Sequence, residues 1–151
     1  LNKSLIISTG MANLGEIEKA IDILEKEGLK REMITILHCT TEYPAPYSEV
    51  NLKALITIRN ALKVSVGYSD HTNGIDVPIA AVALGSTVIE KHFTIDKDLP
   101  GRDNKFAILP EEMKFLSEYI QVFNSSMIDH GIDYQEIETS SRNTYRGRFD
   151  G

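Results

Sequence analysis

The chain has 151 residues, of which 42% are hydrophobic and 25% charged, and its net charge is −6. This is about the length of one ordinary domain and is enough to bury a hydrophobic core. The lack of a basic stripe argues against nucleic acid as a partner. No apolar run approaches the roughly 18 residues of a membrane span, and no signal peptide opens the sequence. A single cysteine, Cys39, excludes an internal disulfide and predicts a cytoplasmic protein.

Four runs rich in β-branched or apolar residues predict buried parallel strands over residues 4–8, 33–38, 63–68 and 86–91. Apolar residues at helical spacing predict helices over 14–27, 51–61, 76–84 and 110–128. The first helix carries a capping-box pair, Asn13 and Glu16, and Gly28 suits its end. This repeated β-α order implies a parallel sheet with right-handed crossovers. It fits either an open doubly wound sheet or half of a (β/α)8 barrel, which typically needs about 250 residues.

Polar residues gather where the predicted strands end. The four groups are Ser8-Thr9-Gly10, His38-Cys39-Thr40-Thr41, Ser69-Asp70-His71-Thr72 and Glu90-Lys91-His92. In a parallel sheet these ends face the same side, which is where α/β folds place their chemistry. The clustering therefore predicts a functional site at this edge.

His71 and His92 follow neighbouring predicted strands, so two imidazoles are expected close together. With water or substrate oxygens they would suit Mn²⁺, Fe²⁺ or Zn²⁺. Asp70 and Glu90 are expected to orient the two rings. The alternative is that each histidine is only a hydrogen-bonded residue at a strand end.

Other polar groups have a weaker case. His38 lies inside a strand and is expected to be a satisfied core residue, and Cys39 is expected to behave as a small buried hydrophobe. Ser8, Thr9 and Gly10, together with Ser69, are candidates to bind a phosphate through hydroxyls and backbone N–H groups. No full glycine-rich loop supports them.

Two loops and the tail complete the chain. The stiff loop 42–47 holds two prolines and two tyrosines, and it is expected either to wall a pocket or to be a rigid connector. The loop 94–109 is long for a βα connection, as lids at active edges often are. Residues 130–151 are expected to form an irregular tail or linker after a domain spanning 1–129. Because the sequence opens on Leu1 and enters a strand at once, we expect it to belong to a larger protein.

Five stretches together resemble the sialic acid (N-acetylneuraminate) synthase family, which includes the bacterial legionaminate and pseudaminate synthases. They are Ile-Ile-Ser-Thr-Gly-Met (6–11), Leu-His-Cys-Thr-Thr-Glu-Tyr-Pro-Ala-Pro-Tyr (37–47), Gly-Tyr-Ser-Asp-His-Thr (67–72), Ile-Glu-Lys-His-Phe-Thr (89–94) and Pro-Gly-Arg-Asp (100–103). The resemblance covers residues 4–120. It implies strands five to eight of a (β/α)8 barrel, without the preceding half and without the family's antifreeze-like domain.

The resemblance also implies chemistry. Family members condense phosphoenolpyruvate with an N-acetylated amino sugar, such as N-acetylmannosamine, to give a sialic acid and phosphate. Matching positions imply two Mn²⁺ ligands, two catalytic residues and four substrate-binding residues. The metal ligands are His71 and His92. The catalytic residues are Glu90 and Asp103. The substrate-binding residues are Ser8, Thr41, Tyr43 and Ser69.

We therefore expect half of a synthase barrel, inactive alone, that forms a homo-oligomer or pairs with the missing half. Two alternatives remain open at this point. One is a non-catalytic βα module covered by a partner chain, since four strands cannot close a barrel. The other is a complete small doubly wound domain that binds a phosphorylated ligand.

Overall fold

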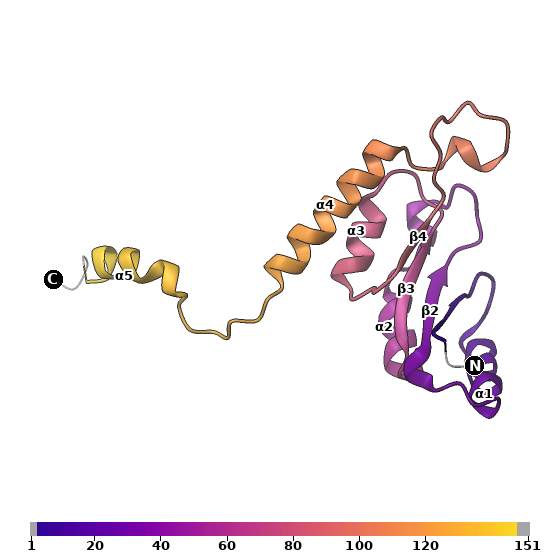
Figure 1. The fold of residues 1–151 in the computed structure, drawn as a ribbon, viewed down its shortest axis with the longest axis horizontal. Coiled ribbons are helices and arrows are strands. Elements are labelled where there is room, and N and C mark those ends of the chain that lie inside the picture. Colours follow the sequence, from indigo (N-terminus) through magenta and orange to yellow (C-terminus); the bar gives the residue numbers. More distant parts are fainter. Residues whose placement is uncertain (1–2, 148–151) are drawn as a thin grey trace.

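Four parallel strands form the centre of the molecule in the computed structural model, which describes residues 3–147 (Figure 1). The strands are β1 (Leu5–Ser8), β2 (Ile34–Cys39), β3 (Ser65–Asp70) and β4 (Ile89–Lys91). They lie side by side in chain order, and every neighbouring pair is parallel. All four strands therefore end at the same edge of the sheet, as the sequence predicts.

One helix follows each strand: α1 (Leu14–Lys26), α2 (Lys53–Leu62), α3 (Asp76–Ala83) and α4 (Pro110–Ser126). The capping box at α1 is confirmed, because the Glu16 N–H donates to Asn13 Oδ1 at 3.1 Å and the Asn13 N–H donates to Glu16 Oε2 at 2.8 Å. Gly28 follows α1 with a φ of +89°, a conformation that favours glycine.

The hydrophobic core fills the space between one face of the sheet and these helices. Alternate strand residues such as Ile34, Ile36 and Val66 pack there against Ile21 of α1 and Leu55 of α2. Residues of opposite parity face the other side, where Ile6, Ser8, Ser65 and Glu90 are exposed. A doubly wound sheet would carry helices on both faces. The chain is instead a curled half-barrel whose inner face is open.

Six of the eight strand ends differ from the sequence prediction, by one to three residues. β3 continues to Asp70, two residues beyond the predicted end, and β4 begins at Ile89 rather than at 86. Sheet bonding to β3 nevertheless starts before β4 proper, because the Thr87 N–H donates to Val66 O at 2.8 Å and Val88 O accepts from the Tyr68 N–H at 2.9 Å.

The remaining elements are short. The 3-10 turns η1 (Arg31–Met33), η2 (Tyr47–Glu49) and η3 (Asp103–Lys105) lie in the connections, and η4 (Glu136–Glu138) leads into α5 (Thr139–Tyr145). Figure 1 shows α5 at the end of an arm that leaves α4 and lies apart from the sheet. The tail is therefore a short helix on an extended linker. Within residues 3–147 no helix combines the length and apolar character needed to cross a membrane.

Candidate active site

His71 and His92 lie side by side just beyond the ends of β3 and β4. The register pairs Ser69 with Glu90 and Asp70 with Lys91, so the two histidines occupy the next position along both strands. Their ring centroids are 5.4 Å apart. Because side chains alternate along a strand, both imidazoles fall on the inner face with Ser69 and Glu90. The prediction that the two imidazoles lie close together is confirmed.

The orientation of His71 is fixed by the backbone of the neighbouring strand's loop. His71 Nδ1 lies 2.8 Å from the Thr40 carbonyl oxygen, which can only accept, so Nδ1 carries the proton and donates. The Ala45 N–H donates to the carbonyl of His71 at 2.9 Å. The ring is buried, and its Nε2 lone pair is left free for a ligand. The expectation that Asp70 or Glu90 would orient this ring is wrong.

Asp70 points to the opposite face of the sheet because it is one residue out of phase with His71. Its Oδ2 lies 2.6 Å from Lys91 Nζ, and the two side chains are 0% and 2% exposed. Asp70 Oδ1 accepts the Thr72 N–H at 2.9 Å, and Lys91 Nζ also donates to Thr72 O at 2.7 Å. These groups form a buried polar cluster behind the histidines.

Glu90 is committed to a different partner. The Ser69 hydroxyl donates to Glu90 Oε1 at 2.6 Å across the inner face. A cavity of about 140 Å³ opens beside them, lined by Ser69, Asp70, His71, Glu90, Lys91 and His92. The carboxylate thus places a negative charge next to both imidazoles, although it orients neither of them.

His92 is held by the long loop 94–109. Its carbonyl accepts the Ile108 N–H at 2.9 Å, and its ring packs edge-on against Phe106 at 5.2 Å between centroids. Asp103, which begins η3 in the same loop, brings Oδ2 to 3.7 Å from His92 Nδ1. The loop therefore delivers Asp103 to the site. Phe106 has no signal in the sequence pattern.

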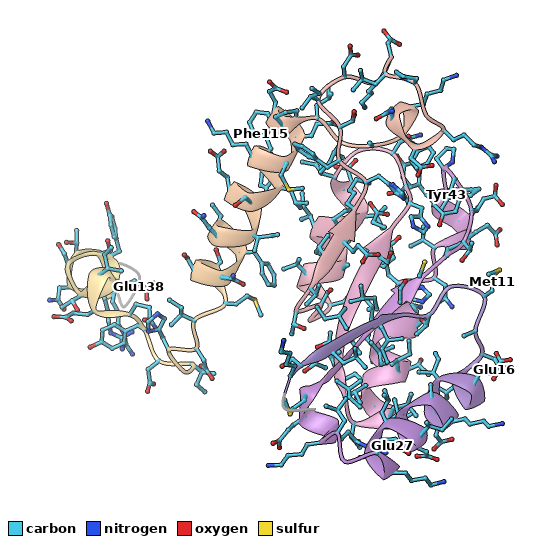
Figure 2. The ribbon with its side chains drawn as sticks, turned by 45° about the vertical axis from the view of Figure 1, so that its right-hand side comes forward. Met11, Glu16, Glu27, Tyr43, Phe115 and Glu138 are labelled. Atoms are coloured by element: carbon cyan, nitrogen blue, oxygen red, sulfur yellow. The ribbon has the colours of Figure 1, made fainter. Side chains whose placement is uncertain are left out.

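Tyr43 covers the histidines from the loop after β2, which Figure 2 shows at the end of the molecule opposite Glu27. Its ring centroid lies 4.1 Å from that of His71 and 5.8 Å from that of His92. Partial burial raises the pKa of the Tyr43 phenol, and the nearby Cys39, Asp103 and Glu90 raise it further. The phenol is therefore a neutral donor at physiological pH. A second cavity of about 330 Å³ lies beside it, lined by Tyr43, His92, Arg102, Asp103 and Phe106.

Of the two residues at the end of β2, His38 matches its predicted role and Cys39 does not. His38 Nε2 is hydrogen-bonded to Val50 O at 2.7 Å, which confirms the interpretation of a satisfied histidine. Cys39 is half-buried rather than a fully buried hydrophobe, and its Sγ lies 3.9 Å from His71 Nδ1. Residue 39 has the parity of the inner face, which explains its place at the site.

The candidate phosphate group at β1 stays apart from the histidines. Ser8 is exposed on the inner face, and the Thr9 hydroxyl donates to Leu37 O at 2.8 Å. Thr41 is exposed, and its side chain lies over Gly10, where an added Cβ would meet it. Ser8, Gly10 and Thr41 thus line the β1–β2 end of the edge, while Ser69 belongs to the histidine cluster.

The imidazole pair fits part of a metal centre. Among the described residues no group of three or more His, Cys, Asp and Glu side chains converges on one point. His71 nonetheless has a fixed tautomer with its second nitrogen free, and His92 is its direct neighbour. Two neutral imidazoles with further positions left to water or substrate oxygens suit a divalent transition-metal ion.

Comparisons with known proteins agree with this architecture and confirm the resemblance found in the sequence. Residues 1–131 match the NeuB family. The N,N'-diacetyllegionaminic acid synthase of Campylobacter jejuni is 58% identical over 129 residues, which are 85% of this chain and 39% of that protein. The pseudaminic acid synthase of the same organism is 37% identical over 140 residues, 93% of this chain and 40% of that protein.

The fold is also that of a solved structure. The N-acetylneuraminic acid (sialic acid) synthetase of Leptospira borgpetersenii, crystallised with citrate, superposes with a TM-score of 0.80 and 32% identity. The match covers 96% of this chain and 51% of that one. The chain thus spans about two fifths of the length of the curated relatives it matches.

Proposed function

We propose that this chain, which belongs to the NeuB family, supplies the metal-binding half of a synthase active site. The reaction condenses phosphoenolpyruvate with an N-acetylated amino sugar to give a sialic acid-type nonulosonate and phosphate. The observation that carries the proposal is the placement of His71 and His92 at one register position, with the His71 tautomer fixed by Thr40. The names of the relatives, legionaminic, pseudaminic and sialic acid synthases, support the product class.

His71 and His92 would hold a divalent ion, which we propose to be Mn²⁺. When bound, this ion supplies a Lewis acid for the aldehyde oxygen of the open-chain sugar. Tyr43 packs on both imidazoles and keeps its proton, so it is placed to donate a hydrogen bond to the sugar. Asp103 lines the adjoining cavity of about 330 Å³ and is placed to accept one.

The bond changes balance with one water molecule. The methylene carbon of phosphoenolpyruvate forms a C–C bond to the aldehyde carbon, and the aldehyde oxygen gains a proton. Water adds to the carbon that bears the phosphate ester and loses one proton. Cleavage of the C–O bond then releases phosphate, which takes the remaining hydroxyl proton, and leaves a ketone. Glu90, exposed on the inner face beside both histidines, is placed to hold that water and accept its proton.

Hydroxyl groups at the same edge are our candidates to bind the phosphate. Ser8 and Thr41 lie at the β1–β2 end with their side chains exposed. Ser69 already donates its hydrogen to Glu90 at 2.6 Å. To donate to a phosphate oxygen, Ser69 must turn its hydroxyl away from Glu90. Substrate binding would thereby release a carboxylate oxygen for the proton transfer.

We propose a second set of four βα units as the partner of the open sheet. Within residues 3–147, strands β1 and β4 end the sheet as unpaired edges, and Ile6 on the inner face is 53% exposed. Unpaired parallel edges are normally covered or closed into a barrel. Barrel closure would place further side chains opposite the histidines, which agrees with the greater length of the relatives.

Mn²⁺ titration of the chain tests the metal assignment, with free Mn²⁺ followed by electron paramagnetic resonance. We expect His71→Ala and His92→Ala each to abolish the binding seen in the unchanged chain. The matched control is His130→Ala, because His130 is an exposed histidine in the arm, away from the site. Binding that survives both site substitutions would overturn the assignment.

A further inference from the structure

A buried ion pair lies directly behind the two histidines. Lys91 Nζ is 2.6 Å from Asp70 Oδ2, and among the ion pairs formed within residues 3–147 it is the one with both side chains fully buried. The Thr72 hydroxyl also donates to Asp70 Oδ2 at 3.2 Å. We call Asp70, Thr72 and Lys91 the polar bracket.

The polar bracket holds the backbone on both sides of one histidine and just before the other. Asp70 and Thr72 flank His71, and the bond from the Thr72 N–H to Asp70 Oδ1 closes a turn over His71. Lys91 immediately precedes His92 and donates to both Asp70 and Thr72 O. The last residues of β3 and β4 are thus linked across the sheet at the position that precedes the imidazole pair.

We propose that the polar bracket is a positioning device that fixes the register of β3 against β4 and so holds His71 and His92 close enough to share one metal ion. The inference deepens the proposed function and rests on its assignment of these histidines as ligands. A slip of one residue would turn a histidine to the opposite face of the sheet. β4 is only three residues long, and its pairing with β3 is extended only by the bonds at Thr87 and Val88, so few ladder bonds resist such a slip.

Fold stability alone is a poor explanation for this cluster. The desolvation of two charges offsets much of their attraction, and apolar residues of similar volume often serve stability as well or better. What an apolar pair cannot supply is a directional link between Lys91 and the backbone at Thr72. A positioning role therefore predicts that stability and metal geometry separate when the charges are removed.

The test uses Cu²⁺ alone as a probe, because Cu²⁺ binds imidazole pairs tightly whichever metal the protein uses naturally. Nitrogen superhyperfine splitting counts the imidazoles bound to the ion. We expect two nitrogens in the unchanged chain. In the double variant Asp70→Asn/Lys91→Met we expect one nitrogen bound to Cu²⁺ and an affinity for Cu²⁺ that is lower by about 10- to 100-fold. We expect its midpoint of thermal unfolding to stay close to that of the unchanged chain. The matched control is Lys114→Met, at an exposed ion pair on α4.

Each outcome decides one claim. Two nitrogens and unchanged affinity in the double variant overturn the positioning role, and so does a single nitrogen in the unchanged chain. If the double variant does not fold, Asp70→Asn alone decides by the same two readouts. Two-nitrogen Cu²⁺ binding without any Mn²⁺ binding would leave the polar bracket standing and reject the proposed metal assignment.

Discussion

Neighbouring residues on β3 and β4 serve different layers of the molecule. Ser69 and Glu90 bond to each other on the inner face, while Asp70 and Lys91 pair on the outer face, one position further along. Both pairs follow from the parallel register, which sets residue 69 against 90 and residue 70 against 91. The sequence Ser-Asp-His beside Glu-Lys-His therefore encodes the inner face that carries the two histidines and the buried ion pair on the outer face at once.

At the residue scale, the buried hydroxyl of Tyr68 leads to a prediction about the free energy of unfolding. Its side chain is 0% exposed, and among the described residues its hydroxyl forms no hydrogen bond of ordinary geometry, although the Asp70 carboxylate lies close enough to influence it. An unsatisfied buried polar group lowers stability, so we expect Tyr68→Phe to raise the free energy of unfolding by about 1 kcal/mol at neutral pH. Urea denaturation measures the change. A loss of stability would show that the hydroxyl has a partner in solution.

The same phenol makes stability depend on alkaline pH. Burial raises the pKa of Tyr68 well above its usual value of 10.0, and the charge of Asp70 raises it further. The folded state then holds this proton more tightly than the unfolded state does. The stability that the Tyr68 proton contributes to the folded state is fully present below about pH 10 and is lost as the pH rises above that. We expect unfolding midpoints measured from pH 9 to 11 to fall less steeply in Tyr68→Phe, and equal slopes would contradict this.

Single-residue roles were predictable only where a side chain carries the signal. The strand-end rule located His71, His92 and Glu90. It could not find the group that orients His71, because that group is the backbone carbonyl of Thr40. A strand that ends at 68 would place Asp70 in the following loop, free to face His71. Two more residues of β3 turn it to the opposite side.

At the element scale, the contact of β3 with its neighbours requires a glycine. An added Cβ at Gly67 would lie 2.7 Å from the Val88 carbonyl oxygen and would also meet the Leu37 side chain. We expect Gly67→Ala to lower the free energy of unfolding by about 1–3 kcal/mol, because the backbone of residue 88 must move. The matched control is Gly15→Ala in α1, where the new Cβ meets only Asn13 Oδ1 at 3.4 Å. Equal unfolding midpoints for both variants would contradict the close approach.

The predicted elements were most accurate where local signals were strong. The capping box, Gly28 and a regular apolar stripe placed α1 within one residue of its end. The start of β4 was placed three residues too early, because residues 86–88 have the composition of a strand. Two of these residues do bond to β3, through Thr87 N–H and Val88 O. The composition therefore predicts correctly that these residues bond to the sheet, but it does not predict where β4 begins.

At the scale of the whole molecule, the half-barrel explains why the site is one-sided. The histidines, Glu90 and Tyr43 all come from β2, β3, β4 and the loops that follow them. Opposite them the inner face is open, with Ser8 and Ser65 exposed. The repeated β-α pattern could predict either a doubly wound sheet or half of a barrel. Only the placement of the helices on one face decides between them.

The open face leads to a prediction about turnover. Phosphoenolpyruvate carries several negative charges, and no cation is among the residues that line the cavity of about 140 Å³ except Lys91, which is paired with Asp70. Arg102 lines the adjoining cavity of about 330 Å³. We expect the further cations that neutralise the proposed substrate to come from the proposed covering half. We expect the 151-residue chain, given phosphoenolpyruvate, an N-acetylated amino sugar and Mn²⁺, to release no more phosphate than buffer does.

A chimera supplies the positive arm of this experiment. In it, the segment that precedes the matched region in a full-length NeuB-family enzyme is joined to Leu1, and the segment that follows is joined after the arm. Because the open face would then be covered, we expect phosphate release to appear and to be lost again on His92→Ala. Robust release by the 151 residues alone would refute the need for a covering half. Release by the chimera that survives His92→Ala would refute the role of the imidazole pair, so the two claims fail on separate measurements.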